Sequence, residues 1–130
     1  MDIKAFRDNL SKYAGYYNPG ALFEKIKEVA RKAGVKLVYI ALLLYYATLD
    51  KDIPTKDRLM ILAALGYFIL PFDLIPDALP GGFADDTAAL VYVLKQVWNN
   101  LTPSAKQKAR TRLQEWFGNV PDSELKIPGL

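Results

Sequence analysis

The sequence predicts an all-α fold: a single compact domain, residues 1–130, of five or six helices around a central apolar helical hairpin. Apolar residues recur at the helical spacing of three and four along most of the chain. Prolines separate these segments or fall in the first turn of the next one, where proline is tolerated. The sequence lacks the alternation of apolar and polar residues that predicts β-strands, so we expect no sheet.

Two helices are expected before the hairpin. Ile3, Phe6 and Leu10 share one face of a short first helix, which the stretch YAGYYNPG then breaks. Pro19 suits the first turn of a second helix, and Gly34 suits its C-terminal cap. The apolar residues that follow the helical period in this second helix are Leu22, Phe23, Ile26, Val29, Ala30 and Ala33.

The hairpin itself consists of two strongly apolar helices. The stretch VKLVYIALLLYYATLD, residues 35–50, is apolar around nearly its whole circumference, and such a helix belongs in a protein core or in a bilayer. After the loop KDIPT, Thr55 is placed to cap the helix KDRLMILAALGYFIL, and Asp57 in its first turn complements the helix dipole. We expect these two helices, packed against the helix that follows them, to form the core.

A turn rich in proline and glycine follows the hairpin. Pro71 and Pro76 stop regular helix, and Gly81 and Gly82 permit backbone angles that other residues resist. These four residues are the predicted structural turn. A long helix is expected to restart near Asp85.

The last helix is predicted to begin at Thr102 and Pro103, which repeat the pattern of a capping residue followed by proline. Its inward face is expected to carry Ala105, Ala109, Leu113, Trp116 and Phe117. The final segment, residues 118–130, contains two prolines and two glycines and is expected to be a loose tail.

The composition narrows the possible functions. The chain has no cysteine and no histidine, which removes disulfides, Cys-His and Ser-His catalysis and the usual zinc sites. Carboxylate, lysine, tyrosine and hydroxyl chemistry remains. Hydrophobic residues make up 52% of the chain and charged residues 24%, which excludes a disordered protein. The net charge of +3 favours an anionic partner surface without requiring one.

Four aspartates lie within or next to the predicted turn, in the stretch LPFDLIPDALPGGFADD: Asp73, Asp77, Asp85 and Asp86. If the loop folds back, these carboxylates converge on one pocket and need a cation or a proton to offset their repulsion. An all-oxygen site of this kind would suit Mg²⁺, Ca²⁺ or Mn²⁺. The alternative is structural, because aspartates also cap helix ends and pair with basic residues. Both interpretations remain open at this point.

The apolar runs raise the question of a membrane. Residues 37–49 and 59–72 are uncharged, but a spanning helix needs about 20 apolar residues, so neither run spans comfortably. Contact with an anionic membrane surface is the candidate role of the basic residues of the second helix and its end: Lys25, Lys27, Arg31, Lys32 and Lys36. A second basic group lies in the last helix: Lys106, Lys108, Arg110 and Arg112. The alternative for both groups is a solvated face above a stripe that packs inward.

The central part of the sequence resembles the YkvA-like family, a bacterial domain of unknown function. The resemblance extends from Tyr39 to Trp98, within a core at residues 36–98. It rests on the hallmark of proline, any residue and Asp-Leu-Ile-Pro-Asp, here Pro71, Asp73, Leu74, Ile75, Pro76 and Asp77, followed by the pair Asp85 and Asp86. The stretch 78–83 departs from the bulkier apolar sequence that the family more often has, which leaves the loop shape open. The resemblance implies no established reaction, and members are often described as membrane-associated.

The function expected from these observations is a non-enzymatic helical domain that associates with a membrane or with a protein partner. We expect it in the cytoplasm or on the cytoplasmic side of a membrane, because the start MDIKAFRDNLSKYAGYY has no signal-peptide pattern. No nucleic-acid motif accompanies the basic residues. The alternatives are a cation site at the aspartates that supports phosphate or water chemistry, and a soluble protein-interaction domain.

Overall fold

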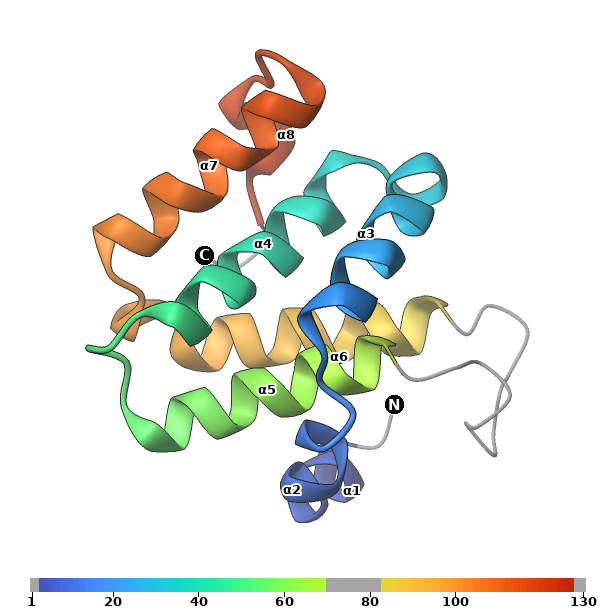
Figure 1. Ribbon diagram of the computed structural model, residues 1–130, viewed down its shortest axis with the longest axis vertical. Coiled ribbons are helices and arrows are strands. Elements are labelled where there is room, and N and C mark those ends of the chain that lie inside the picture. Colours follow the sequence, from blue (N-terminus) through green and yellow to red (C-terminus); the bar gives the residue numbers. More distant parts are fainter. Residues whose placement is uncertain (1–2, 70–82, 128–130) are drawn as a thin grey trace.

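The computed structural model describes residues 3–69 and 83–127, without the side chains of residues 31–33 and 83–87. All regular structure in these residues is helical, which confirms the predicted all-α fold (Figure 1). Within the described residues, five helices have fifteen residues each, and four short helical segments accompany them. In chain order the elements are α1 (Ile3–Asp8), α2 (Leu10–Ala14), α3 (Pro19–Ala33), α4 (Val35–Leu49), α5 (Thr55–Ile69), α6 (Phe83–Val97), the 3₁₀ segment η2 (Trp98–Asn100), α7 (Pro103–Phe117) and α8 (Asp122–Leu125).

Helix α4 is the centre of the protein. Every residue from 37 to 44 is buried, so all sides of this stretch of the helix are covered. The covering comes from α3, α5, α6, α7 and α8, which all contact α4. Figure 1 shows α4 between α7 on one side and the pair α5 and α6 on the other. The apolar circumference of α4 is thus accounted for by burial inside the protein.

Helix α5 approaches the N-terminal helices very closely at Gly66. A Cβ atom at this position would overlap the backbone carbonyl of Tyr13 in α2. The aromatic rings of Phe6, Tyr13 and Tyr67 meet beside this contact, with centroid separations of 5.1 to 6.1 Å. The absence of a side chain at Gly66 therefore lets α2 lie against the backbone of α5, and the three rings fill the space around the contact.

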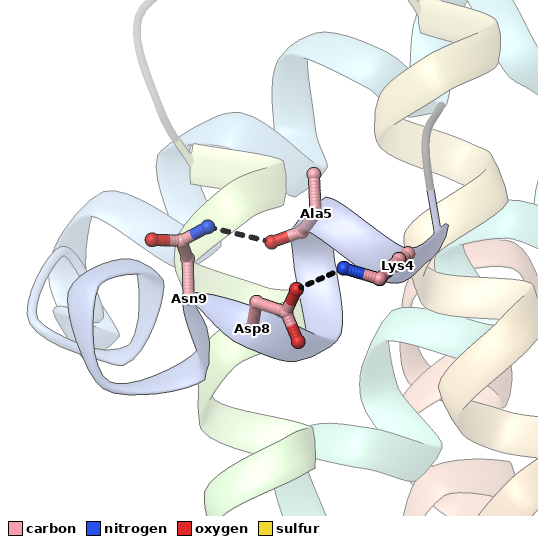
Figure 2. A network of polar contacts seen from close by, with 4 residues as sticks. All are labelled: Lys4, Ala5, Asp8 and Asn9. Atoms are coloured by element: carbon pink, nitrogen blue, oxygen red, sulfur yellow. Dashed lines mark hydrogen bonds and ion pairs between the residues drawn. The ribbon is translucent and has the colours of Figure 1, made fainter.

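The N-terminal segment forms two short helices, where the sequence predicts one. The helix stops at Asn9, whose φ of −125° lies outside the helical range. Figure 2 shows the reason: the Asn9 side chain donates a hydrogen bond of 2.7 Å to the carbonyl of Ala5, while Lys4 and Asp8 form an ion pair one turn away. An asparagine that bonds to nearby backbone competes with the regular helix. Phe6 is buried as predicted, whereas Ile3 is exposed.

The predicted helix ends are largely confirmed. Asn18 accepts a hydrogen bond from the Ala21 N–H, with Pro19 in the first turn of α3. Thr102 accepts one from the Ala105 N–H at the start of α7. The third of these ends is Gly34, which separates α3 from α4 with a φ of 84°, a backbone angle that glycine adopts without strain.

In the C-terminal half one expectation holds and two differ from the structure. Helix α6 begins at Phe83, close to the expected restart near Asp85. Phe117, expected to face inward, is 37% exposed at the end of α7. The predicted loose tail is partly packed, because Leu125 and Ile127 are buried and α8 contacts α4. Burial of these two apolar side chains stabilises the packed arrangement, although the prolines and glycines of this segment disfavour regular structure.

We expect Gly66→Ala to lower the free energy of unfolding by about 2 kcal/mol or more, since the new methyl group would force α2 away from α5. Urea unfolding followed by circular dichroism measures this change. Gly20→Ala is the matched control, because Gly20 is an exposed helical glycine whose added Cβ would meet no backbone atom and would lie 3.2 Å from the side-chain oxygen of Asn18. Equal stability of the two variants would contradict the close contact at Gly66.

Candidate functional site

The predicted aspartate site lies mostly outside the described residues. Asp73 and Asp77 are not among them, and neither is the predicted structural turn of Pro71, Pro76, Gly81 and Gly82. Asp85 and Asp86 belong to the first turns of α6, but their side chains are not described. Within the described part of the chain, no three residues of the metal-binding types cluster closely enough to hold a metal ion. A Mg²⁺, Ca²⁺ or Mn²⁺ site at the four aspartates thus stays a prediction.

The predicted basic surface on α3 carries charge of both signs. Lys27 is exposed, and so is Lys36 at the start of α4. Lys25 is half-buried, and its ammonium lies 5.8 Å from the centroid of the Phe68 ring. Glu24 and Glu28 are exposed on the same helix and offset the lysines. The described residues of α3 therefore offer little net positive charge.

Arg31 and Lys32, two further members of that predicted set, lie in the last turn of α3. The structure does not describe their side chains. The role of all five basic residues at a membrane surface stays a prediction.

Helix α7 has a one-sided charge distribution. Its buried residues Ala105, Ala109 and Leu113 recur every four residues and face the body of the protein, where α7 packs against α4. From residue 103 to residue 114 the helix has no acidic residue and four basic ones, Lys106, Lys108, Arg110 and Arg112. The apolar stripe is thus already occupied, and the positive charge is concentrated on the remaining surface.

The two arginines of α7 are held by neighbouring groups. Arg110 pairs with Asp122 of α8. Arg112 donates a hydrogen bond of 3.2 Å to the Tyr46 hydroxyl and lies 3.7 Å from Glu115. The contact with Tyr46 raises the pKa of Arg112 above its ordinary value. Both arginines therefore help to fix α7 on the body of the protein.

The two lysines of α7 are more available. The ammonium group of Lys106 lies 4.1 Å from the centroid of the Trp98 ring, a cation–π distance. Lys108 is exposed. Together with Lys51, exposed in the loop after α4, they form a group of three lysines that we call the lysine group. Lys51 and Lys108 line the same pocket, whereas Lys106, two residues before Lys108, lies on another side of α7 beside Trp98.

A polar junction centred on Asp50 joins three helices beside this group. Asp50 ends α4, and its carboxylate accepts hydrogen bonds from the Thr102 hydroxyl and, at 2.9 Å, from the Asp52 N–H. The Arg58 guanidinium of α5 donates a bond of 2.6 Å to the Asp50 carbonyl. Since Thr102 also caps α7, Asp50 connects the end of α4 to α5 and to the start of α7.

The junction also fixes the charge of Asp50. The hydrogen bond from Thr102 is the main cause that lowers the pKa of Asp50 below its usual value. The Asp52 N–H acts in the same direction, as do the positive charges of Lys108 and Arg58, and partial desolvation opposes them. Asp50 is therefore ionised at neutral pH.

A pocket of about 350 Å³ opens next to the junction. It lies between the end of α4, the loop that follows and the first two turns of α7, and it is lined by Tyr46, Leu49, Asp50, Lys51, Asp52, Thr102, Ser104, Ala105 and Lys108. Leu49 is 62% exposed, which makes it the most exposed of the large apolar side chains that the structure describes. The sequence analysis missed this pocket, because no pattern relates residues near 50 to residues near 104 before the fold is known.

Comparison with known proteins finds similarity in the middle of the chain. Residues 57–94 match the family described as "Protein of unknown function (DUF1232)". A relative from Bacillus subtilis (strain 168), "Uncharacterized membrane protein YkvA", is 38% identical over 60 residues, which cover 45% of this chain and 53% of the relative. The match thus spans about half the length of that curated protein. No solved structure matches the chain.

The family match covers most of α5 and α6, and the pocket lies outside it. The matched residues start at Asp57, next to Arg58 of the junction, whereas the pocket is built from residues 46–52 and 102–108. None of the helices in residues 3–69 and 83–127 combines the length and the apolar character needed to cross a bilayer.

We expect Asp50→Asn to destabilise the protein at pH 7, and the loss should shrink in acid. The pKa of Asp50 is lower in the folded state than in the unfolded state. Its contribution to stability is therefore complete above the unfolded pKa of about 3.9 and is lost as the pH falls through the folded-state pKa. Urea midpoints of wild type and variant between pH 7 and pH 2 measure this. Asp52→Asn is the control, since the backbone of Asp52 makes the bond. A pH-independent difference, or an equal effect of the control, would contradict the junction.

Proposed function

Because residues 57–94 belong to the YkvA-like DUF1232 family, we propose that this chain is a non-enzymatic helical domain that associates peripherally with an anionic membrane surface. The observation that carries the proposal is the charge of α7, with four basic residues and no acidic residue from 103 to 114. The printed name of the Bacillus subtilis relative, a membrane protein, supports the same location.

The lysine group would make the electrostatic contact. Lys51, Lys106 and Lys108 extend from the loop after α4 to the first two turns of α7. Each lysine near an anionic bilayer contributes about 1 kcal/mol of attraction. Flexible lysine side chains suit this role, because they reach headgroups without a fixed geometry.

Two apolar side chains lie beside members of the lysine group, Trp98 beside Lys106 and Leu49 in the lining shared with Lys51 and Lys108, and would contact the bilayer interface. Trp98 is half-buried beneath Lys106, and tryptophan favours the headgroup level of a bilayer. Leu49 is largely exposed next to the pocket and adjoins the loop that carries Lys51. An exposed leucine flanked by lysines suits shallow contact with acyl chains, with the charges at the headgroups.

Peripheral attachment fits the packing of the central helices better than insertion does. The apolar side chains of α4 from residue 37 to residue 44 are already buried against other helices, and so are most of those in α5. Insertion of either helix would break these contacts before new ones formed with lipid. Each buried leucine or isoleucine contributes about 1.5–3 kcal/mol relative to exposure in water.

We expect the wild-type chain to sediment with vesicles that contain phosphatidylglycerol and to be released by high salt. Replacing the lysine group by Lys51→Gln, Lys106→Gln and Lys108→Gln should weaken this binding about a hundredfold, at about 1 kcal/mol for each lysine.

The matched control for that triple variant removes the same charge from positions outside both predicted basic groups: Lys12→Gln, Lys56→Gln and Lys95→Gln, all exposed. It should bind nearly as the wild type does. Equal losses in both triple variants, or wild-type binding to neutral vesicles of equal strength, would contradict the proposal. Protein that resists both salt and a carbonate wash would show insertion instead of peripheral attachment.

A further inference from the structure

The pocket beside the Asp50 junction combines both signs of charge in a small space. Two lysines, Lys51 and Lys108, and two aspartates, Asp50 and Asp52, line it together with the hydroxyl-bearing Ser104. Its volume of about 350 Å³ is at the lower end of the range for small-molecule sites. The charges therefore balance within a cavity that has room for a small polar group.

We propose that this pocket binds a lipid headgroup that carries both a phosphate and a primary ammonium group, as phosphatidylethanolamine does. The proposal rests on the proposed membrane association and adds a specificity to it.

The mixed charge of the pocket favours a zwitterion over a simple ion. A lone phosphate would be attracted by the two lysines but repelled by the two aspartates, and a lone cation would be attracted by the aspartates but repelled by the lysines. A headgroup with one phosphate and one ammonium is attracted by both pairs and is repelled as a whole by neither. Electrostatic complementarity of this kind determines which ligand is selected more than how tightly any ligand binds.

The junction leaves specific groups for the ligand. The Asp50 carboxylate already accepts hydrogen bonds from the Thr102 hydroxyl and the Asp52 N–H, so it belongs to the structure of the junction. The side chains of Lys51, Asp52 and Lys108 are exposed at the mouth of the pocket. The lysines would pair with the phosphate, and the Asp52 carboxylate would accept hydrogen bonds from the ammonium.

A primary ammonium has three N–H donors, whereas the quaternary ammonium of phosphatidylcholine has none. Asp52 would therefore discriminate between two headgroups that have the same net charge. Ser104 would add a hydroxyl donor to a phosphate oxygen.

Leu49 gives the pocket an orientation toward the bilayer. It lines the pocket and is 62% exposed, so the apolar side chain and the charged groups open toward the same solvent region. A headgroup that enters the pocket brings its acyl chains next to Leu49. Binding of the headgroup and contact of the leucine with lipid would thus reinforce each other.

The experiment compares two sets of vesicles that contain the same mole fraction of phosphatidylglycerol and differ only in phosphatidylethanolamine or phosphatidylcholine. We expect the 130-residue chain to bind the phosphatidylethanolamine vesicles about tenfold more tightly, which corresponds to one charge-assisted hydrogen-bonded contact. The Asp52→Asn variant should lose this preference and bind both sets equally. Glu28→Gln, which removes one exposed acidic charge from α3, should keep the preference.

Free O-phosphoethanolamine separates the headgroup chemistry from the bilayer. Amide signals of residues 50–52 and 104–108 should shift when it is added, and those of α3 should not. Equal binding of wild type to both vesicle sets would overturn the headgroup pocket and leave membrane association intact. Absence of binding to any vesicle would overturn both proposals, and a preference unchanged in Asp52→Asn would overturn the role of the pocket.

Discussion

The fold depends on the need to cover α4 on every side. Its residues from 37 to 44 are all buried, although α4 is only fifteen residues long. A helix that is apolar all round gains stability only where neighbours remove each face from water, so at least three helices must surround it. Here α3, α5, α6, α7 and α8 do so. The close contact of α2 with α5 at Gly66 extends the same packing to the N-terminal segment.

The polar surface follows from this arrangement. Covering α4 uses the apolar stripe of α7 at Ala105, Ala109 and Leu113, which leaves the basic residues of α7 on the outside. Where α4 ends, Asp50 adds polar contacts between the helices, because it accepts hydrogen bonds from Thr102 and Arg58. The pocket opens at this point, between the end of α4, the loop after it and the start of α7. The proposed membrane site is thus a consequence of how the core helix ends.

Local features of the structure could be predicted from the sequence, and long-range ones could not. Pro19 in the first turn of α3, the cap at Thr102 and the positive φ of Gly34 follow from short patterns. The apolar circumference of residues 35–50 is consistent with both a core and a bilayer, because hydropathy does not tell which apolar environment surrounds a helix. The Asp50–Thr102 bond joins residues 52 positions apart, and the packing of Leu125 and Ile127 depends on α4 being nearby. The predicted aspartate site lies mostly outside the described residues and remains a hypothesis.

Amide hydrogen exchange of the protein in plain buffer, without lipid or detergent, tests most directly whether α4 is a protein core helix. We expect residues 37–44 to be the slowest-exchanging stretch of the chain, with exchange only through global unfolding, because five helices cover them. Fast exchange in buffer, with protection that develops only after detergent or lipid is added, would contradict this. It would mean that the apolar surface of α4 is completed by lipid.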